Sequence, residues 1–299
     1  VLKILREFSK CRIVDMQQNI LPSTHRVVDA ARFVSINDDA VENFCRTFSP
    51  DNAVTAELGD VRGMDLEQLL NLVFIFNTMN FTFWAAQGEE KWSVQIRGTT
   101  MDGASGLFAV LERAVQKNVP LLNTQFLAEL TERQLADILR GNVEIPMLQE
   151  RVECLQEAGR VLAEQFDGNF LNVLEEAHRD AVELTDLCVM AFSHFFDAAT
   201  LDGQEVEFHK RAQFNAEMVN YRLTKNGKQS LRNIALLTGF ADYKVPQMLR
   251  KFGILEYRRE LAEKVDAYEE IPAGSREEIE IRSCMIWALE NMKHALQER

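Results

Sequence analysis

The residue best suited to chemistry is Asp242, which lies between two aromatic residues in the stretch TGFADYKVPQMLRKFG (238–253). An amphipathic basic helix is expected just after it, and aspartate is a preferred residue at a helix N-terminus. One interpretation is that Asp242 is only a helix cap, and the residues taken alone favour this. The other is that the capping carboxylate is also catalytic, held ionised by backbone N–H groups, while Phe240 and Tyr243 form a flat slot for a planar ligand. Such a charge suits glycosidic cleavage, in which positive charge develops on the sugar.

The second candidate is Lys210, in the stretch EFHKRAQF (207–214), where a short strand is expected to pass into a helix. It is either a solvated lysine beside Arg211 or a cation held near Asp242. The sequence leaves both interpretations open.

Other candidate sites fail on their spacing. His178 follows Glu175 in an E-x-x-H pattern, but a di-iron helix bundle needs that pattern twice. His194 and Asp197 share a predicted helix face without a third metal ligand. The five cysteines include no C-x-x-C pair, so we expect reduced thiols, and the chain has neither a phosphate-binding loop nor a G-x-S-x-G motif. A metal-free enzyme without a cofactor, or a helical binding module, is what remains.

The elements that must position these residues are mostly helices. WSVQIRG (92–98) alternates as a strand of a small hairpin, and a turn at Asp202-Gly203 indicates a second short strand pattern over 200–209. Capping pairs are expected at Asp65 with Gln68 and at Thr131 with Gln134. Helical spacing covers residues 39–48, 65–79, 106–118, 131–141, 147–166, 169–192, 210–222, 229–237, 244–252, 256–265 and 275–296. Because no linker or repeat interrupts it, we predict one compact, mainly α domain over 1–299.

Composition limits the possible partners. Hydrophobic residues make up 46% of the 299 residues, enough for a globular core. The formal charge of −13 argues against wrapping DNA or tRNA but leaves room for a small anion in a local basic pocket. No apolar run reaches bilayer length and no signal-peptide pattern is visible, so we expect a cytoplasmic protein that does not bind membranes.

Several separate stretches occur together in a recognisable order. They are NFTFW (80–84), FHKRAQ (208–213), FADYKVPQML (240–249) with GILEY (253–257), and GSREEIEIRSC (274–284). From about residue 40 to its end, the chain resembles the queuosine salvage family, the queuosine 5′-phosphate N-glycosylases.

The resemblance implies hydrolysis of the N-glycosidic bond of queuosine 5′-monophosphate, with release of queuine for tRNA modification. It implies a glycosylase-like fold with a few short strands, similar to helix-hairpin-helix DNA glycosylases, and no metal or cofactor. We also expect a monomer. Lys210 and Asp242 match the catalytic positions. The expected substrate-binding residues are Phe240, Tyr243, Asn80, Phe83 and Trp84.

The last shared stretch is expected to be structural. Ser275 would cap its helix, and Glu280 would pair with Arg282 within it. Possible phosphate donors are Arg97, Lys244 and Arg250, and the residues do not decide among them.

The chain departs from the family in two places. Ala104-Ser105 replaces a Tyr-Trp pair, and family members usually continue past Arg299 with a ligand-binding segment. Because the chain also begins with Val, we expect truncation at both termini. Two alternatives stay open: a glycosylase for another modified nucleotide or damaged DNA, and a non-catalytic protein that binds queuine nucleotides.

Overall fold

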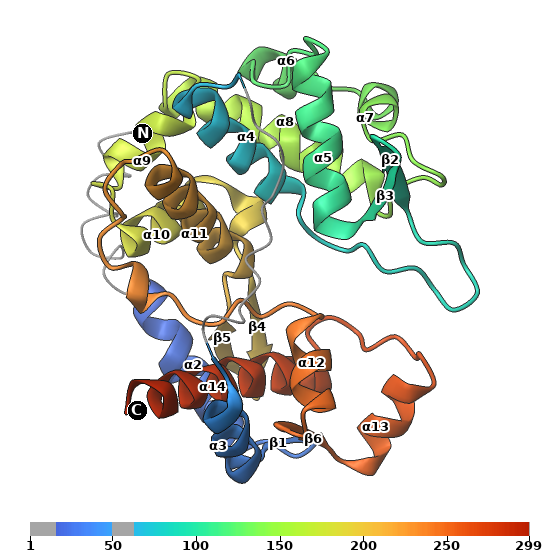
Figure 1. Ribbon diagram of the computed structural model, residues 1–299, viewed down its shortest axis with the longest axis vertical. Helices are drawn as coiled ribbons and strands as arrows, with labels where there is room; N and C mark the ends of the chain where they lie inside the picture. Colours follow the sequence, from blue (N-terminus) through green and yellow to red (C-terminus); the bar gives the residue numbers. More distant parts are fainter. Residues whose placement is uncertain (1–15, 50–62, 299) are drawn as a thin grey trace. The chain divides into compact units, whose positions relative to one another are not determined.

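The computed structural model describes residues 16–49 and 63–298 (Figure 1). Contacts divide the chain into two compact units. The first unit comprises residues 1–55, 197–213 and 236–299, and the second comprises 56–196 and 214–235. Helix α11 (Lys210–Lys225) begins in the first unit and continues in the second. That the two units form one domain stays a prediction.

The first unit is built around a long C-terminal helix, α14 (Arg276–Gln297). The other elements of the unit are α2 (Met16–Asp29), β1 (Val34–Ile36), α3 (Asp38–Thr47), β4 (Ala198–Leu201), β5 (Gln204–Glu207), α12 (Val245–Lys251), β6 (Leu255–Tyr257) and α13 (Arg259–Asp266). Helix α14 packs against α2, α3 and β1, and its residues Ile279, Met285 and Ile286 are fully buried in the core. The Ser275 side chain accepts a hydrogen bond from the Glu278 N–H, which confirms the predicted cap.

Two short antiparallel pairings complete the first unit. Strand β1 pairs with β6, with Ser35 opposite Glu256, and so joins segments far apart in the sequence. Strands β4 and β5 form a hairpin, and its turn residues Asp202 and Gly203 both have positive φ, as a tight two-residue turn requires. This confirms the predicted turn at Asp202-Gly203.

The second unit surrounds α4 (Leu66–Met79), in which every residue from Leu69 to Met79 is buried. Its other elements are β2 (Ser93–Ile96), β3 (Thr99–Asp102), α5 (Gly103–Gln116), α6 (Thr124–Ala128), α7 (Glu132–Ile138), α8 (Leu148–Gln165), α9 (Phe170–Glu176), α10 (Ala181–Ala191) and the 3-10 turn η2 (Ser193–Phe195). Helices α5, α8 and α9 pack against α4. The capping boxes at Asp65 and Thr131 and the β2–β3 hairpin are present as predicted.

Two predicted helices are wrong. Residues 169–192 form α9 and α10, separated by His178 and Arg179, which both have positive φ. Residues 229–237 contain no α-helix, only the 3-10 turn η3 (Ile234–Leu236). The cause is shared, because the Arg232 N–H donates to the Arg179 carbonyl and the Arg232 carbonyl accepts from the Ala181 N–H. Backbone groups engaged in this bridge cannot make helical hydrogen bonds.

The prediction of a mainly α protein with a few short strands is confirmed. Helices dominate both units, and the described strands form three two-stranded sheets.

Candidate active site

The carboxylate of Asp242 is held by the start of α12. Its Oδ1 accepts hydrogen bonds from the N–H groups of Lys244 at 2.8 Å and Val245 at 2.9 Å. The predicted capping interaction is therefore confirmed, although the N-cap itself is Lys244, two positions later. Two backbone donors fix the orientation of the acid.

Lys210 begins α11 in the same unit. Burial lowers the pKa of its ammonium to about 8, even though the negative charge of Asp242 acts in the opposite direction. Asp197 also favours the protonated form, whereas Arg211 and Arg282 disfavour it. The structure thus brings Lys210 into electrostatic interaction with Asp242, which the sequence left undecided.

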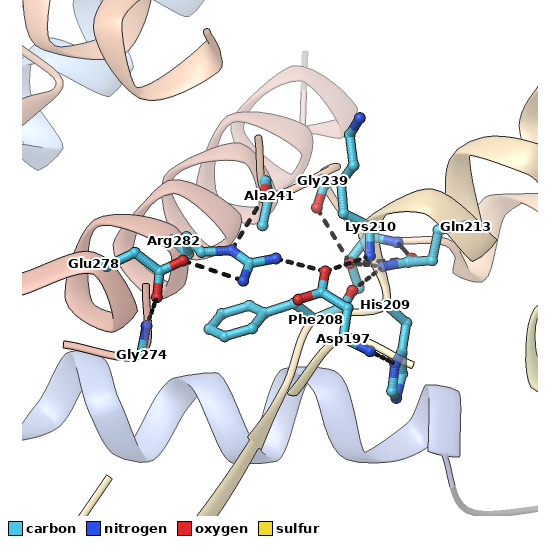
Figure 2. Close-up of polar contacts among 11 residues, drawn as sticks. Asp197, Phe208, His209, Lys210, Gln213, Gly239, Ala241, Gly274, Glu278 and Arg282 are labelled. Atoms are coloured by element: carbon cyan, nitrogen blue, oxygen red, sulfur yellow. Dashed lines mark hydrogen bonds and ion pairs between the residues drawn. The ribbon is translucent and has the colours of Figure 1, made fainter. Parts of the chain in front are cut away.

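An ion pair lies beside the start of α11 (Figure 2). Arg282 of α14 donates from Nη2 to Asp197 Oδ2 at 2.6 Å, and the same oxygen accepts the Lys210 backbone N–H at 3.1 Å. Burial would raise the pKa of Asp197, but the Arg282 charge and hydrogen bonds outweigh it and lower that pKa. In Figure 2 the Lys210 side chain extends away from this pair.

The predicted pairing of Glu280 with Arg282 is wrong. Residues two apart on a helix do not face each other. Arg282 contacts Glu278 one turn earlier, whereas Glu280 accepts the backbone N–H groups of Arg32 at 3.0 Å and Phe33 at 2.7 Å.

A buried amide joins the start of α11 to the stretch that leads to Asp242. Gln213 donates to the Phe208 carbonyl at 2.9 Å and accepts the Thr238 N–H at 2.9 Å. At the next residue, Gly239, an added Cβ would lie 2.5 Å from Leu289 Cδ1 of α14. A side chain at position 239 would therefore require the Leu289 side chain to shift.

The two predicted aromatic residues flank Asp242 in the sequence and differ in exposure. Phe240 is half-buried, whereas Tyr243 is exposed and lies 5.6 Å from Lys244 Nζ, measured to its ring centroid. Among the predicted phosphate donors, Arg250 makes a bidentate pair with Asp266 at 2.7 and 2.9 Å. Lys244 itself is exposed.

The remaining predicted residues belong to the second unit and are described within it, separately from Asp242 and Lys210. Asn80 is the buried C-cap of α4, and Phe83 is buried against Trp92 with their ring centroids 6.3 Å apart. Trp84 is 42% exposed, so it is the member of this stretch that offers a ring face to a ligand.

The backbone of this stretch is held by a buried arginine. Arg151 donates to the carbonyls of Phe81 at 2.6 Å and Thr82 at 2.7 Å, and also contacts the Met79 carbonyl. Of the other residues considered in the second unit, Arg97 is exposed in the β2–β3 turn, and Ala104-Ser105 lies in the first turn of α5.

Sequence reasoning missed Asp197 and Arg282 as members of the site. Asp197 was considered only as a metal ligand, and Arg282 only as a partner of Glu280. The one usable signal was the place of Arg282 inside a shared motif. Within residues 16–49 and 63–298, no group of three acidic, His or Cys side chains is arranged to hold a metal ion, and no helix is long and apolar enough to cross a membrane.

Comparison with known proteins identifies the family. A family model described as "Queuosine salvage protein" matches residues 61–299. The chain is 39% identical over 284 residues to a Sphaerobacter thermophilus protein named "Queuosine 5'-phosphate N-glycosylase/hydrolase", covering 94% of this chain and 86% of the relative. Relatives of the same name occur in Bos taurus, at 35% identity over 79% of this chain and 70% of the relative, and in Dictyostelium discoideum, at 27% over 91% and 84%. The chain belongs to the queuosine salvage protein family.

Proposed function

We propose that this chain is an N-glycosyl hydrolase that cleaves queuosine 5′-monophosphate and releases queuine for salvage into tRNA. The observation that carries the proposal is Asp242, a carboxylate fixed by two backbone donors near the half-buried Lys210. The shared name of relatives up to 39% identical supplies the substrate and the bond that is broken.

The substrate explains why a fixed carboxylate matters. Queuine is a 7-deazaguanine, so its leaving group cannot be activated by protonation at N7. The reaction must then depend more on stabilising the positive charge that develops on the ribose. Asp242 does this either by attacking C1′ or by stabilising the oxocarbenium ion electrostatically.

Lys210 acts through its charge. With a pKa of about 8 it is mainly protonated at neutral pH, so it places a positive charge in electrostatic interaction with Asp242. We assign it to keeping Asp242 charged and to orienting the ribose or the attacking water.

The base is bound by aromatic side chains in this proposal. The residues proposed to bind the substrate are Phe240, Tyr243, Asn80, Phe83 and Trp84. The exposure of Tyr243 and Trp84 supports this, because both offer ring surface to a ligand. The phosphate donors are drawn from Arg97, Lys244 and Arg250.

The proposal also concerns where and on what the chain acts. The substrate is the free nucleotide rather than intact tRNA, the chain works as a monomer in the cytoplasm, and no metal ion takes part. The formal charge of −13 supports the free nucleotide, because proteins that bind long polyanions present basic surfaces.

The test is direct detection of the product. Purified protein is incubated with queuosine 5′-monophosphate in the presence of a chelator, and free queuine is measured by mass spectrometry. Release by the wild-type protein and its loss in Asp242→Asn would support the reaction and its main residue together. Binding of the nucleotide without release would reject hydrolysis in favour of a binding protein.

A further inference from the structure

One guanidinium, that of Arg282, joins several elements of the first unit. Besides Asp197 at 2.6 Å, its Nε donates to the Ala241 carbonyl at 3.2 Å and its Nη1 to Glu278 at 3.2 Å. The group lies 3.8 Å from the centroid of the Phe208 ring. Its side chain is only 16% exposed, so these contacts form largely out of water, where they are strong.

Two of these contacts lead directly to the proposed catalytic residues. Ala241 is bonded to Asp242, so the hydrogen bond to its carbonyl restrains the backbone that carries the acid. Asp197 accepts the backbone N–H of Lys210 at 3.1 Å, which restrains the start of α11. We infer that Arg282 and Asp197 form a positioning pair, which sets the placement of Asp242 relative to Lys210; this inference rests on the proposed function.

The pair also affects the charge of Lys210. The charged groups that act on Lys210 are Asp242 before α12, Asp197 before β4, Arg211 in its own helix and Arg282 in α14. The two acids favour the ammonium and the two arginines disfavour it. Removing the charge of Arg282 should therefore raise the pKa of Lys210, and removing that of Asp197 should lower it.

Helix α14 contains a matched control. Arg276 is 18% exposed and also pairs with an aspartate of the β4–β5 region, Asp202. Arg276 Nη1 also lies 3.6 Å from Oε1 of Glu280, four residues away in the same helix. Arg282 has the same kind of contact with Glu278, four residues before it. Asp202 lies in the hairpin turn rather than beside Lys210, so Arg276→Gln removes a similar ion pair without touching the positioning pair.

The first readout does not depend on activity. The side chain of Lys210 is titrated by NMR in lysine-labelled protein, with Lys210→Arg used to assign its signal. We expect a higher pKa in Arg282→Gln, a lower one in Asp197→Asn, a value nearer wild type in Arg282→Lys, and no change in Arg276→Gln. If the pair had a purely structural role, Arg282→Gln and Asp197→Asn would not shift the pKa of Lys210 in opposite directions.

The second readout is turnover of queuosine 5′-monophosphate. A displacement of about 1 Å between reacting groups costs on the order of 100-fold in rate. We therefore expect kcat to fall by about that factor in Arg282→Gln with little change in KM, partial recovery in Arg282→Lys, and near-normal turnover in Arg276→Gln.

The outcomes separate the two proposals. If the wild-type protein releases no queuine, the proposed function fails, and the Lys210 titrations still decide the positioning pair. The positioning pair would be overturned by any of three results: Lys210 pKa shifts in the same direction in Arg282→Gln and Asp197→Asn, no Lys210 pKa shift in either, or equal effects of Arg276→Gln. Should Arg282→Gln not fold, Asp197→Asn gives the decision, because an unchanged Lys210 pKa in that variant would reject the pair.

Discussion

Two aspartates, one in each unit, accept a pair of backbone N–H groups where a helix begins: Asp180 is the N-cap of α10, whereas Asp242 precedes Lys244, the N-cap of α12. Asp242 accepts the N–H groups two and three residues later, at 2.8 and 2.9 Å, before α12. Asp180 accepts the N–H groups two and three residues later, at 3.0 and 3.3 Å, before α10. Local geometry alone does not distinguish a structural acid from a catalytic one.

The surroundings do distinguish them. Asp180 is buried, and its Oδ2 accepts from Asn233 Nδ2 at 2.6 Å, with Arg232 at 3.8 Å. Asp242 is half-buried and has the half-buried cation Lys210 as an electrostatic neighbour. Both acids have a cation near them, but Arg232 is 59% exposed, whereas Lys210 is half-buried. A carboxylate at a helix start becomes a candidate for chemistry when its own surface stays accessible to a ligand and the cation near it is partly shielded from water.

The variant Asp242→Asn tests most directly whether Asp242 differs in function from Asp180. We expect turnover of queuosine 5′-monophosphate to fall roughly 1,000-fold, because the charge that stabilises the cationic sugar is lost. Asparagine is as good a cap, so the free energy of unfolding should change by less than about 0.5 kcal/mol. Mass spectrometry of queuine and thermal unfolding measure the two effects. Near-wild-type turnover would mean that Asp242, like Asp180, has only a structural role.

Removing the cation tests the neighbour that separates the two acids. Lys210→Met keeps an apolar side chain of similar length and removes the positive charge. We expect kcat to fall by about 100-fold, since the positive charge that interacts with Asp242 is lost. Steady-state kinetics of the folded variant give the result. An unchanged kcat would mean that the neighbouring charge is incidental.

The pH dependence follows from the pKa of Lys210, which is about 8. As the pH rises through this value the ammonium loses its proton, so kcat/KM should fall about tenfold for each further pH unit. In Lys210→Arg, which stays charged, any remaining activity should persist to higher pH. Activity that instead rises through pH 8 would assign Lys210 the role of a base.

Local signals explain which parts of this architecture the sequence predicts. The caps at Asp65, Thr131 and Ser275 and the turn at Asp202-Gly203 depend on neighbours within four residues, and all are present. Helical periodicity also indicated the mainly α fold. The cap at Asp242 was predictable for the same reason.

The failures involve partners far apart in the chain. The break between α9 and α10 depends on backbone pairing with Arg232, which no local pattern reveals. The contact between Asp197 and Arg282 joins positions 85 residues apart, and the approach of Lys210 to Asp242 likewise depends on tertiary packing. Apolar and charged periodicity describes which face of a helix is buried, but not which side chain lies opposite it.

The smallest effect on activity is expected at the second cap. Asp180→Asn replaces Oδ2 by a donor that faces the donor Nδ2 of Asn233, so a partly buried hydrogen bond is lost. This should cost about 1–3 kcal/mol in the free energy of unfolding and leave turnover unchanged. Adding Asn233→Asp exchanges donor and acceptor and should recover most of the stability in thermal unfolding. If Asp180→Asn instead removed turnover while the protein stayed folded, Asp180 would matter for turnover without Lys210 as its neighbour. The comparison with Asp242 would then fail.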